Sequence, residues 1–262
     1  MKRRILSAML TLCMVLSLFP GTAWAAEEIR GETSDKSTAS ETTSDAGIMP
    51  LADTLTYGDL FYVVNDDTIE ITDCNIEATS VDIPEQINGC TVTSIGPEAF
   101  DICRNLTNVT IPNSVKSIGR GAFLNCNSLS SITIPDSVTS LGDGMFFQCN
   151  SLTSVTIPQG ITSIGSLMFY GCSSLTDVII PNSVTDIGND AFYGCIELAN
   201  ITIPYGVTRI HGTAFSNSGL TSVTIPDSVT YIGNRAFGDC NRLTHVITSE
   251  KQSRKKMQKV VK

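Results

Sequence analysis

Cysteine is the residue type in this chain with the greatest capacity for chemistry, and most of the nine cysteines are regularly spaced. Thiolates hold zinc when Cys-x-x-Cys pairs converge, and that spacing is absent. Equal spacing in a repeated fold instead predicts one stacked column, in which cysteine acts as a compact apolar side chain. Disulfides between neighbouring repeats are the alternative in an exported protein. The series runs Cys103, Cys126, Cys149, Cys172 and Cys195, then Ser218, then Cys240, while Cys74 and Cys90 lie outside it.

Histidines and carboxylates show no arrangement typical of an enzyme. The two histidines, His211 and His245, adjoin no serine or cysteine in a recognisable nucleophile signature. The HExxH, GxSxG, Walker and GxGxxG motifs are absent, and the Asp and Glu residues are scattered without an acid–base pair. We therefore predict a protein that is not an enzyme, with no catalytic, cofactor-binding or metal-ligating residue.

The cysteine series belongs to a repeated unit of 23 residues. An Ile-Pro dipeptide recurs seven times, with a first interval of 28 residues and then intervals of 23, 23, 23, 23 and 22. A second marker, Ala-Phe or Met-Phe, also recurs seven times and keeps the same phase. The consensus is L-x-x-V-x-I-P-x-S-V-x-x-I-G-x-x-A-F-x-x-C-x-S. The isoleucines of the Ile-Pro pairs are Ile83, Ile111, Ile134, Ile157, Ile180, Ile203 and Ile225.

Each part of the unit has a structural interpretation. In residues 106–111 apolar and polar side chains alternate, which predicts a half-buried strand, and the next residue, proline, ends it. Val115 and Ile118 supply inward contacts, Gly119 marks a turn, and the following residues predict one helical or 3₁₀ turn that buries Phe123. Stacked about 4.8 Å apart, such units predict an α/β repeat solenoid over residues 81–248. Short parallel strands form one face, and turns or short helical segments form the other.

The outward strand positions are the candidate binding surface, because that face binds ligands in many solenoids. They form a nearly uncharged ladder whose hydroxyls can hydrogen-bond glycans or an extended peptide. The alternative is that threonine simply suits an exposed strand. Asp177 and Ile179 interrupt the ladder and are a candidate hot spot. The predicted ligand-binding residues are Asn108, Thr110, Ser131, Thr133, Ser154, Thr156, Asp177, Ile179, Asn200, Thr202, Ser222 and Thr224.

A second candidate interface consists of tyrosines and one arginine at positions where other repeats carry small or polar residues. Tyr and Arg are common anchors of protein interfaces, although single exposed aromatic residues are also ordinary. The residues are Tyr170, Tyr193, Tyr205, Arg209 and Tyr231.

The segments outside the repeats indicate export. Residues 1–25 combine a basic start, an apolar run and an Ala-Trp-Ala cleavage pattern, which predicts a signal peptide. Residues 26–52, rich in Ser, Thr and Glu, predict a disordered linker. Residues 53–80 predict an N-terminal capping hairpin. Residues 249–262 carry six Lys and Arg, and predict either a short helix over the last repeat or a basic tail for wall polymers or anionic lipid.

Charge and hydropathy limit the partners and the location. Residues 53–249 contain six Lys and Arg against 19 Asp and Glu, a formal net charge of −13. Such an acidic body argues against nucleic acid or an anionic membrane as partner. After signal cleavage no apolar run is long enough to span a bilayer. We expect a secreted protein, with cell-surface association open.

The 23-residue unit and its expanded opening copy, IPEQINGCTVTSIGPEAF at residues 83–100, closely resemble BspA-like leucine-rich repeats of the Treponema pallidum type. The resemblance covers about residues 75–248 and implies a leucine-rich-repeat arc. It also implies adhesion to, or recognition of, extracellular or host-surface proteins or glycans. Two alternatives are a structural envelope spacer with no specific ligand and an N-terminal fragment of a larger surface protein.

Overall fold

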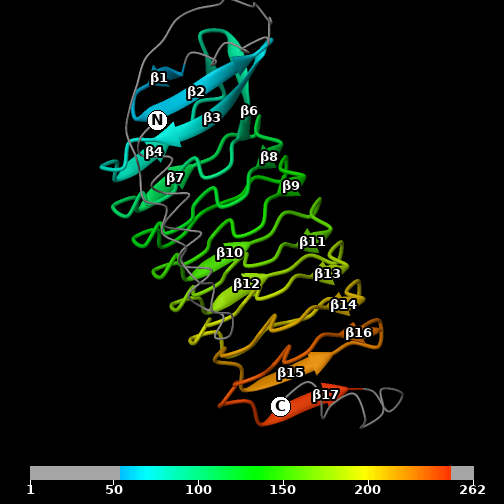
Figure 1. Cartoon of the computed structure of the whole chain (residues 1–262). Helices are drawn as coiled ribbons and strands as arrows, with labels where there is room; N and C mark the ends of the chain where they lie inside the picture. The colour runs from blue at the N-terminus through cyan, green and yellow to red at the C-terminus, as the bar shows by residue number, and fades with distance from the viewer. Residues whose placement is uncertain (1–53, 249–262) are drawn as a thin grey trace, which may run out of the picture. The chain divides into compact units, whose positions relative to one another are not determined.

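The computed structural model describes residues 54–248, which form a coil of stacked rungs (Figure 1). Each regular rung contributes short strands to two columns, which run along two sides of the coil, and a run of turns to a third side. The predicted signal peptide, linker and basic C-terminal segment lie outside the described residues. No helix in the described part of the chain is long and apolar enough to cross a membrane.

An antiparallel sheet precedes the regular rungs. β1 (Leu55–Tyr57) pairs with β2 (Leu60–Asn65), and β2 pairs with β3 (Thr68–Cys74), both antiparallel. β3 then pairs in parallel with β6 (Cys90–Ile95), whose own antiparallel partner is β5 (Gln86–Ile87). The last strand of the hairpin is therefore hydrogen-bonded directly to the first rung.

Within each of the two strand columns the strands pair in parallel, which confirms the predicted solenoid. Sequence analysis predicted strands on one face only, so the second column is an additional finding. The first column contains β4 (Ser80–Asp82), β7 (Asn108–Thr110), β10 (Ser154–Thr156), β12 (Asp177–Ile179), β15 (Ser222–Ile225) and β17 (His245–Thr248). The second contains β8 (Ser117–Ile118), β9 (Ser140–Leu141), β11 (Ser163–Ile164), β13 (Asp186–Ile187), β14 (Arg209–Ile210) and β16 (Tyr231–Ile232).

The third side is built from turns, and the described residues contain no helical or 3₁₀ segment there or elsewhere. The residues two positions before and after each phenylalanine have positive φ, as at Gly121 and Asn125 around Phe123 (both 60°). Left-handed residues cannot continue a right-handed helix. The amides of these three residues instead donate to carbonyls of the next rung at 2.8–2.9 Å. Hydrogen bonds between rungs therefore take the place of the predicted helical turn. They satisfy the backbone amides around each phenylalanine, which a helix within one rung would have to satisfy instead.

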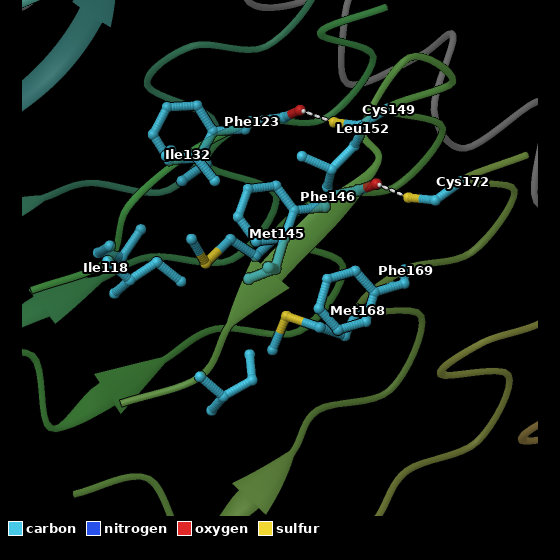
Figure 2. Close-up of a cluster of buried hydrophobic side chains, with 14 of the residues drawn as sticks. Ile118, Phe123, Ile132, Met145, Phe146, Cys149, Leu152, Met168, Phe169 and Cys172 are labelled. Atoms are coloured by element: carbon cyan, nitrogen blue, oxygen red, sulfur yellow. Dashed lines mark hydrogen bonds between the residues drawn. The ribbon is translucent and has the colours of Figure 1, made fainter. Parts of the chain in front are cut away.

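A column of phenylalanines forms the centre of the coil. Consecutive rings stack nearly parallel, with centroids 4.9–5.8 Å apart. Figure 2 shows three of them, Phe123, Phe146 and Phe169, beside Met145 and Met168, which fill the position held by alanine in the other rungs. The column comprises Phe100, Phe123, Phe146, Phe169, Phe192, Phe215 and Phe237, all fully buried.

The regularly spaced cysteines pack beside this column and donate hydrogen bonds across rungs. The Cys149 thiol donates to the Phe123 carbonyl at 3.0 Å, and the Cys172 thiol donates to the Phe146 carbonyl at 3.0 Å (Figure 2). All eight cysteines in residues 54–248 are free thiols. Burial, followed by the neighbouring cysteine in the column, raises the pKa of the Cys149 and Cys172 thiols well above the usual range. The column is therefore neutral and structural in this arrangement.

Three interruptions of the strand columns coincide with isoleucine in place of valine. In regular rungs an amide just before the strand donates to the preceding rung at 2.8–3.0 Å. Ser130, Ala199 and Thr162 make no such bond, and their rungs carry Ile132, Ile201 and Ile161 where the other rungs carry valine. We attribute the missing bonds to the extra methyl group, which needs room in a close-packed interior.

We expect that the double substitution Ala199→Thr/Ile201→Val will join residues 200–202 to β12. The smaller side chain removes the steric cause, and threonine at position 199 supplies the hydroxyl that Thr176 and Thr221 direct at the preceding rung. Amide exchange at Asn200 and Thr202 should slow by about tenfold, the effect of one hydrogen bond worth ~1.4 kcal/mol. The converse control, Val178→Ile, should speed exchange at Asp177. Unchanged exchange in both variants would refute the steric explanation.

We expect that stability will fall in alkaline solution because of the cysteine column. The folded thiols have raised pKa values, whereas unfolded thiols titrate near 8.5. Folded protein therefore retains protons that the unfolded chain releases, so this stabilisation is present below pH ~8.5 and is lost above it. Urea unfolding from pH 7 to pH 10 should show a loss of about 1.4 kcal/mol per pH unit for each buried thiol. The substitution Cys149→Ala should reduce that slope by one thiol, and an unaltered slope would contradict the assignment.

Candidate functional site

The structure places the twelve predicted ligand-binding residues along the outer side of the first strand column. All are exposed except Ser222, which is half-buried. The same two positions continue into Ser80 and Asp82 before them, and into His245 and Ile247 after them. Sequence analysis missed the first pair because the 28-residue interval hides its phase. The register of β17 with β15 identifies the last pair.

Two shallow hollows lie side by side on this surface in the C-terminal half. The first, of about 280 Å³, lies between β12 and residues 200–202. The second, of about 470 Å³, lies between residues 201–205 and strands β15 and β17. They share Ile201 and Thr202, and we call the combined surface the strand groove. Its outward side chains are Asp177, Ile179, Asn200, Thr202, Tyr205, Thr224, Asp227 and Ile247.

The strand groove coincides with the interruption at Ile201. Within the described residues, the backbone of residues 200–203 makes no hydrogen bond to either neighbouring rung. On this side of the coil, the backbone bond that connects the rung to the next one runs from the Thr221 amide to the Ala199 carbonyl, at 2.9 Å. The hollows thus follow from a break in sheet pairing, and the main-chain groups of residues 200–203 remain available to water or a ligand.

The groove combines exposed apolar side chains with negative charge. Ile179 is 53% exposed, Ile247 is 55% exposed and Tyr205 is 84% exposed. The charged residues among those lining the two hollows are Asp177 and Asp227. This surface can bury aliphatic groups and attract cations, with threonine hydroxyls as hydrogen-bonding partners between them. The predicted hot spot, Asp177 and Ile179, forms one end of it.

The second candidate interface from sequence analysis does not form one surface. On the turn side Tyr170 stacks between Tyr193 and Phe147, with ring centroids 4.9 and 4.7 Å away respectively. Tyr205 lines the strand groove. Arg209 and Tyr231 are paired residues of β14 and β16 in the second column. The five residues therefore occupy three separate places, and Tyr205 joins the first candidate surface.

A polar cluster that sequence analysis did not identify surrounds Asp186. Its carboxylate accepts hydrogen bonds from the Arg209 guanidinium and the Thr185 hydroxyl, and His211 Nε2 lies 3.7 Å away. Partial burial raises the pKa of Asp186, but the bonds from Arg209 and Thr185 outweigh burial and the pKa is lowered overall. Parallel pairing of β13 with β14 brings Asp186 and Arg209 together, so the signal was their shared repeat position.

The described residues contain no group of three His, Cys, Asp or Glu side chains placed to hold a metal ion. The strand groove offers charge, hydroxyl groups and exposed apolar area.

Comparisons with known proteins agree with the repeat architecture. The model of the BspA type leucine rich repeat region matches residues 72–189 and 162–258, with six copies. A leucine-rich repeat protein of T. pallidum, TpLRR, is similar in structure, with 33% identity and a TM-score of 0.66 over 73% of this chain and 91% of that one. No curated protein sequence matches the chain.

Two further solved structures are similar over part of their length. One is a leucine rich cell surface protein from Faecalibacterium prausnitzii, at 30% identity and a TM-score of 0.54, covering 74% of this chain and 54% of that one. The other is a leucine-rich repeat protein from Eubacterium ventriosum, at 26% identity and a TM-score of 0.59, covering 70% and 50%. The chain thus spans about half the length of these two. With repeats matched across most of its length, the chain belongs to the BspA-type leucine-rich repeat family.

Proposed function

We propose that this protein is an exported binding module that recognises an extracellular protein or glycan through the strand groove. Export is supported by the signal-peptide pattern of residues 1–25. A surface location is supported by the similar protein of F. prausnitzii, which is described as a cell surface protein. Recognition, rather than a purely structural role, is supported by the local departure of the groove from the repeat.

The observation that carries the proposal is the pair of exposed isoleucines on an otherwise hydroxyl-rich surface. Ile179 and Ile247 stand at a repeat position that other rungs fill with threonine. Those threonines are Thr110, Thr133, Thr156, Thr202 and Thr224. Threonine hydroxyls alone exchange bonds with water for bonds with a ligand, at small net gain. Burial of aliphatic side chains adds about 25 cal/mol for each Å² of apolar surface removed from water. The isoleucines supply the part of the surface from which affinity can come.

We expect that the double substitution Ile179→Ser/Ile247→Ser will weaken binding to the natural ligand by at least about tenfold, because truncation of an apolar anchor residue can cost more than about 1 kcal/mol for each residue. Binding is measured with residues 27–262 on an array of matrix proteins, mucins and glycans. The matched control is Ile196→Ser, another exposed isoleucine in the same half of the chain that lines neither hollow.

Circular dichroism of all three proteins checks that the fold is retained. An equal loss of binding in the Ile196→Ser control would show that the effect is general and not due to the groove. Absence of any ligand across the array, with all proteins folded, would contradict the proposal and favour a spacer role.

A further inference from the structure

We infer that the strand groove takes a basic, extended segment of another polypeptide. This inference rests on the proposed function, since it assumes that the groove is the binding site, and it narrows the ligand from protein or glycan to one chemical class.

Charge gives the first step of the argument. The two hollows are lined by Asp177 and Asp227 and by no lysine, arginine or histidine. Both carboxylates lie on exposed residues, and neither belongs to an ion pair among the described residues. They stand in a repeat region whose formal net charge is −13 over residues 53–249. An acidic ligand would be repelled by this surface, whereas a ligand with lysine or arginine gains attraction that steers it to the groove.

The apolar residues favour a polypeptide over a glycan. Ile179 and Ile247 offer branched aliphatic surface, which packs against aliphatic side chains of a partner. Tyr205 is the one aromatic residue that lines the hollows, and it lies at their edge, after Pro204. The flat apolar platforms on which sugar rings stack are therefore reduced to one residue in the groove. Carboxylates next to exposed aliphatic side chains instead match a peptide that carries both basic and aliphatic side chains.

The arrangement of the hollows favours an extended conformation. They lie in succession along the stacking direction and share Ile201 and Thr202. Asp177 and Asp227 belong to rungs two apart, roughly 10 Å along the stack. Asp227 follows a proline and stands at the repeat position of Asn182, so the two carboxylates are also separated along the strand direction. An extended peptide that crosses the groove diagonally covers such a separation in about five or six residues. Basic side chains at positions i and i+4 or i+6 lie on one face of that peptide and can meet the two carboxylates. Aliphatic side chains between them can contact the isoleucines and the hollows.

The test compares three twelve-residue peptides that share one sequence frame and carry lysine, glutamine or glutamate at the same four positions. Their binding to the full chain is measured by titration calorimetry, at low and high salt. We expect the lysine peptide to bind best and the glutamate peptide worst, with affinity that falls as salt rises. Asp177→Asn and Asp227→Asn should each lower the affinity for the lysine peptide about two- to fivefold, the effect expected of an exposed charge pair.

The matched control is Asp136→Asn, which removes the same charge from the equivalent position after proline in a rung outside the groove. Its binding of the lysine peptide should be unchanged. An equal loss in this control would assign the effect to the general field of the protein and overturn the inference. Equal affinity for all three peptides would also overturn it.

Two further outcomes separate this inference from the proposed function. If an oligosaccharide on the array binds in a manner that depends on Ile179 and Ile247 while the lysine peptide does not bind, the proposed function holds and the inference fails. A second variant changes all six Lys and Arg of residues 251–262 to glutamine. If the lysine peptide binds this variant alone, the occupant is the C-terminal segment of the chain itself, and the inference of a partner polypeptide is overturned.

Discussion

The distance between successive rungs is the quantity on which the rest of this structure depends, because three sides of the coil use it at once. On two sides amides just before the strands donate to the preceding rung, and on the third side the amides around each phenylalanine donate to the following rung. The phenylalanine rings of neighbouring rungs stack on one another at a similar spacing, with centroids 4.9–5.8 Å apart. No rung can satisfy its backbone hydrogen-bonding groups alone. A side chain that alters the spacing between rungs therefore changes the hydrogen bonds between them first, and the surface only as a consequence.

This constraint explains why an interior residue creates a surface feature. Ile201 points inward and is partly buried, yet its consequence is the loss of backbone pairing over residues 200–203 and the hollows on either side of them. Ile132 and Ile161 have the same effect on pairing elsewhere in the coil. In each case the bond that is lost connects the isoleucine rung to the rung before it, while the bond to the rung after it is kept. At Ile201 the interruption is wider, because residues 200–203 lack backbone bonds to both neighbouring rungs in the part of the chain that the structure describes.

Much of the fold could be predicted from the sequence because its causes are local and repeated. The alternation in residues 106–111 predicts a strand, and Gly119 predicts a close approach: a Cβ atom there would lie 2.5 Å from the backbone nitrogen of Pro97. Of the two forms predicted for the third side, turns or short helical segments, the structure has turns. The sequence signal, a short segment ending in a buried phenylalanine, does not distinguish a helical turn from turns with left-handed residues. Asn125 and Gln148 adopt positive φ only because the adjacent rung receives their amides.

The sequence predicts which residues of the candidate site lie on the exposed side of a strand column, but it does not predict the shape of the surface that they form. Repeat phase placed Asp177 and Ile179 on the exposed side of a strand, but Tyr205 follows a proline in a turn, and only the folded coil brings it beside Ile247. The groove therefore has two separate determinants. Inward residues such as Ile201 determine whether the sheet opens, and outward residues such as Asp177 and Asp227 determine what the opening attracts. Because the repeat keeps these sets on opposite sides of the backbone, the outward residues of such a solenoid can vary without a change in its core.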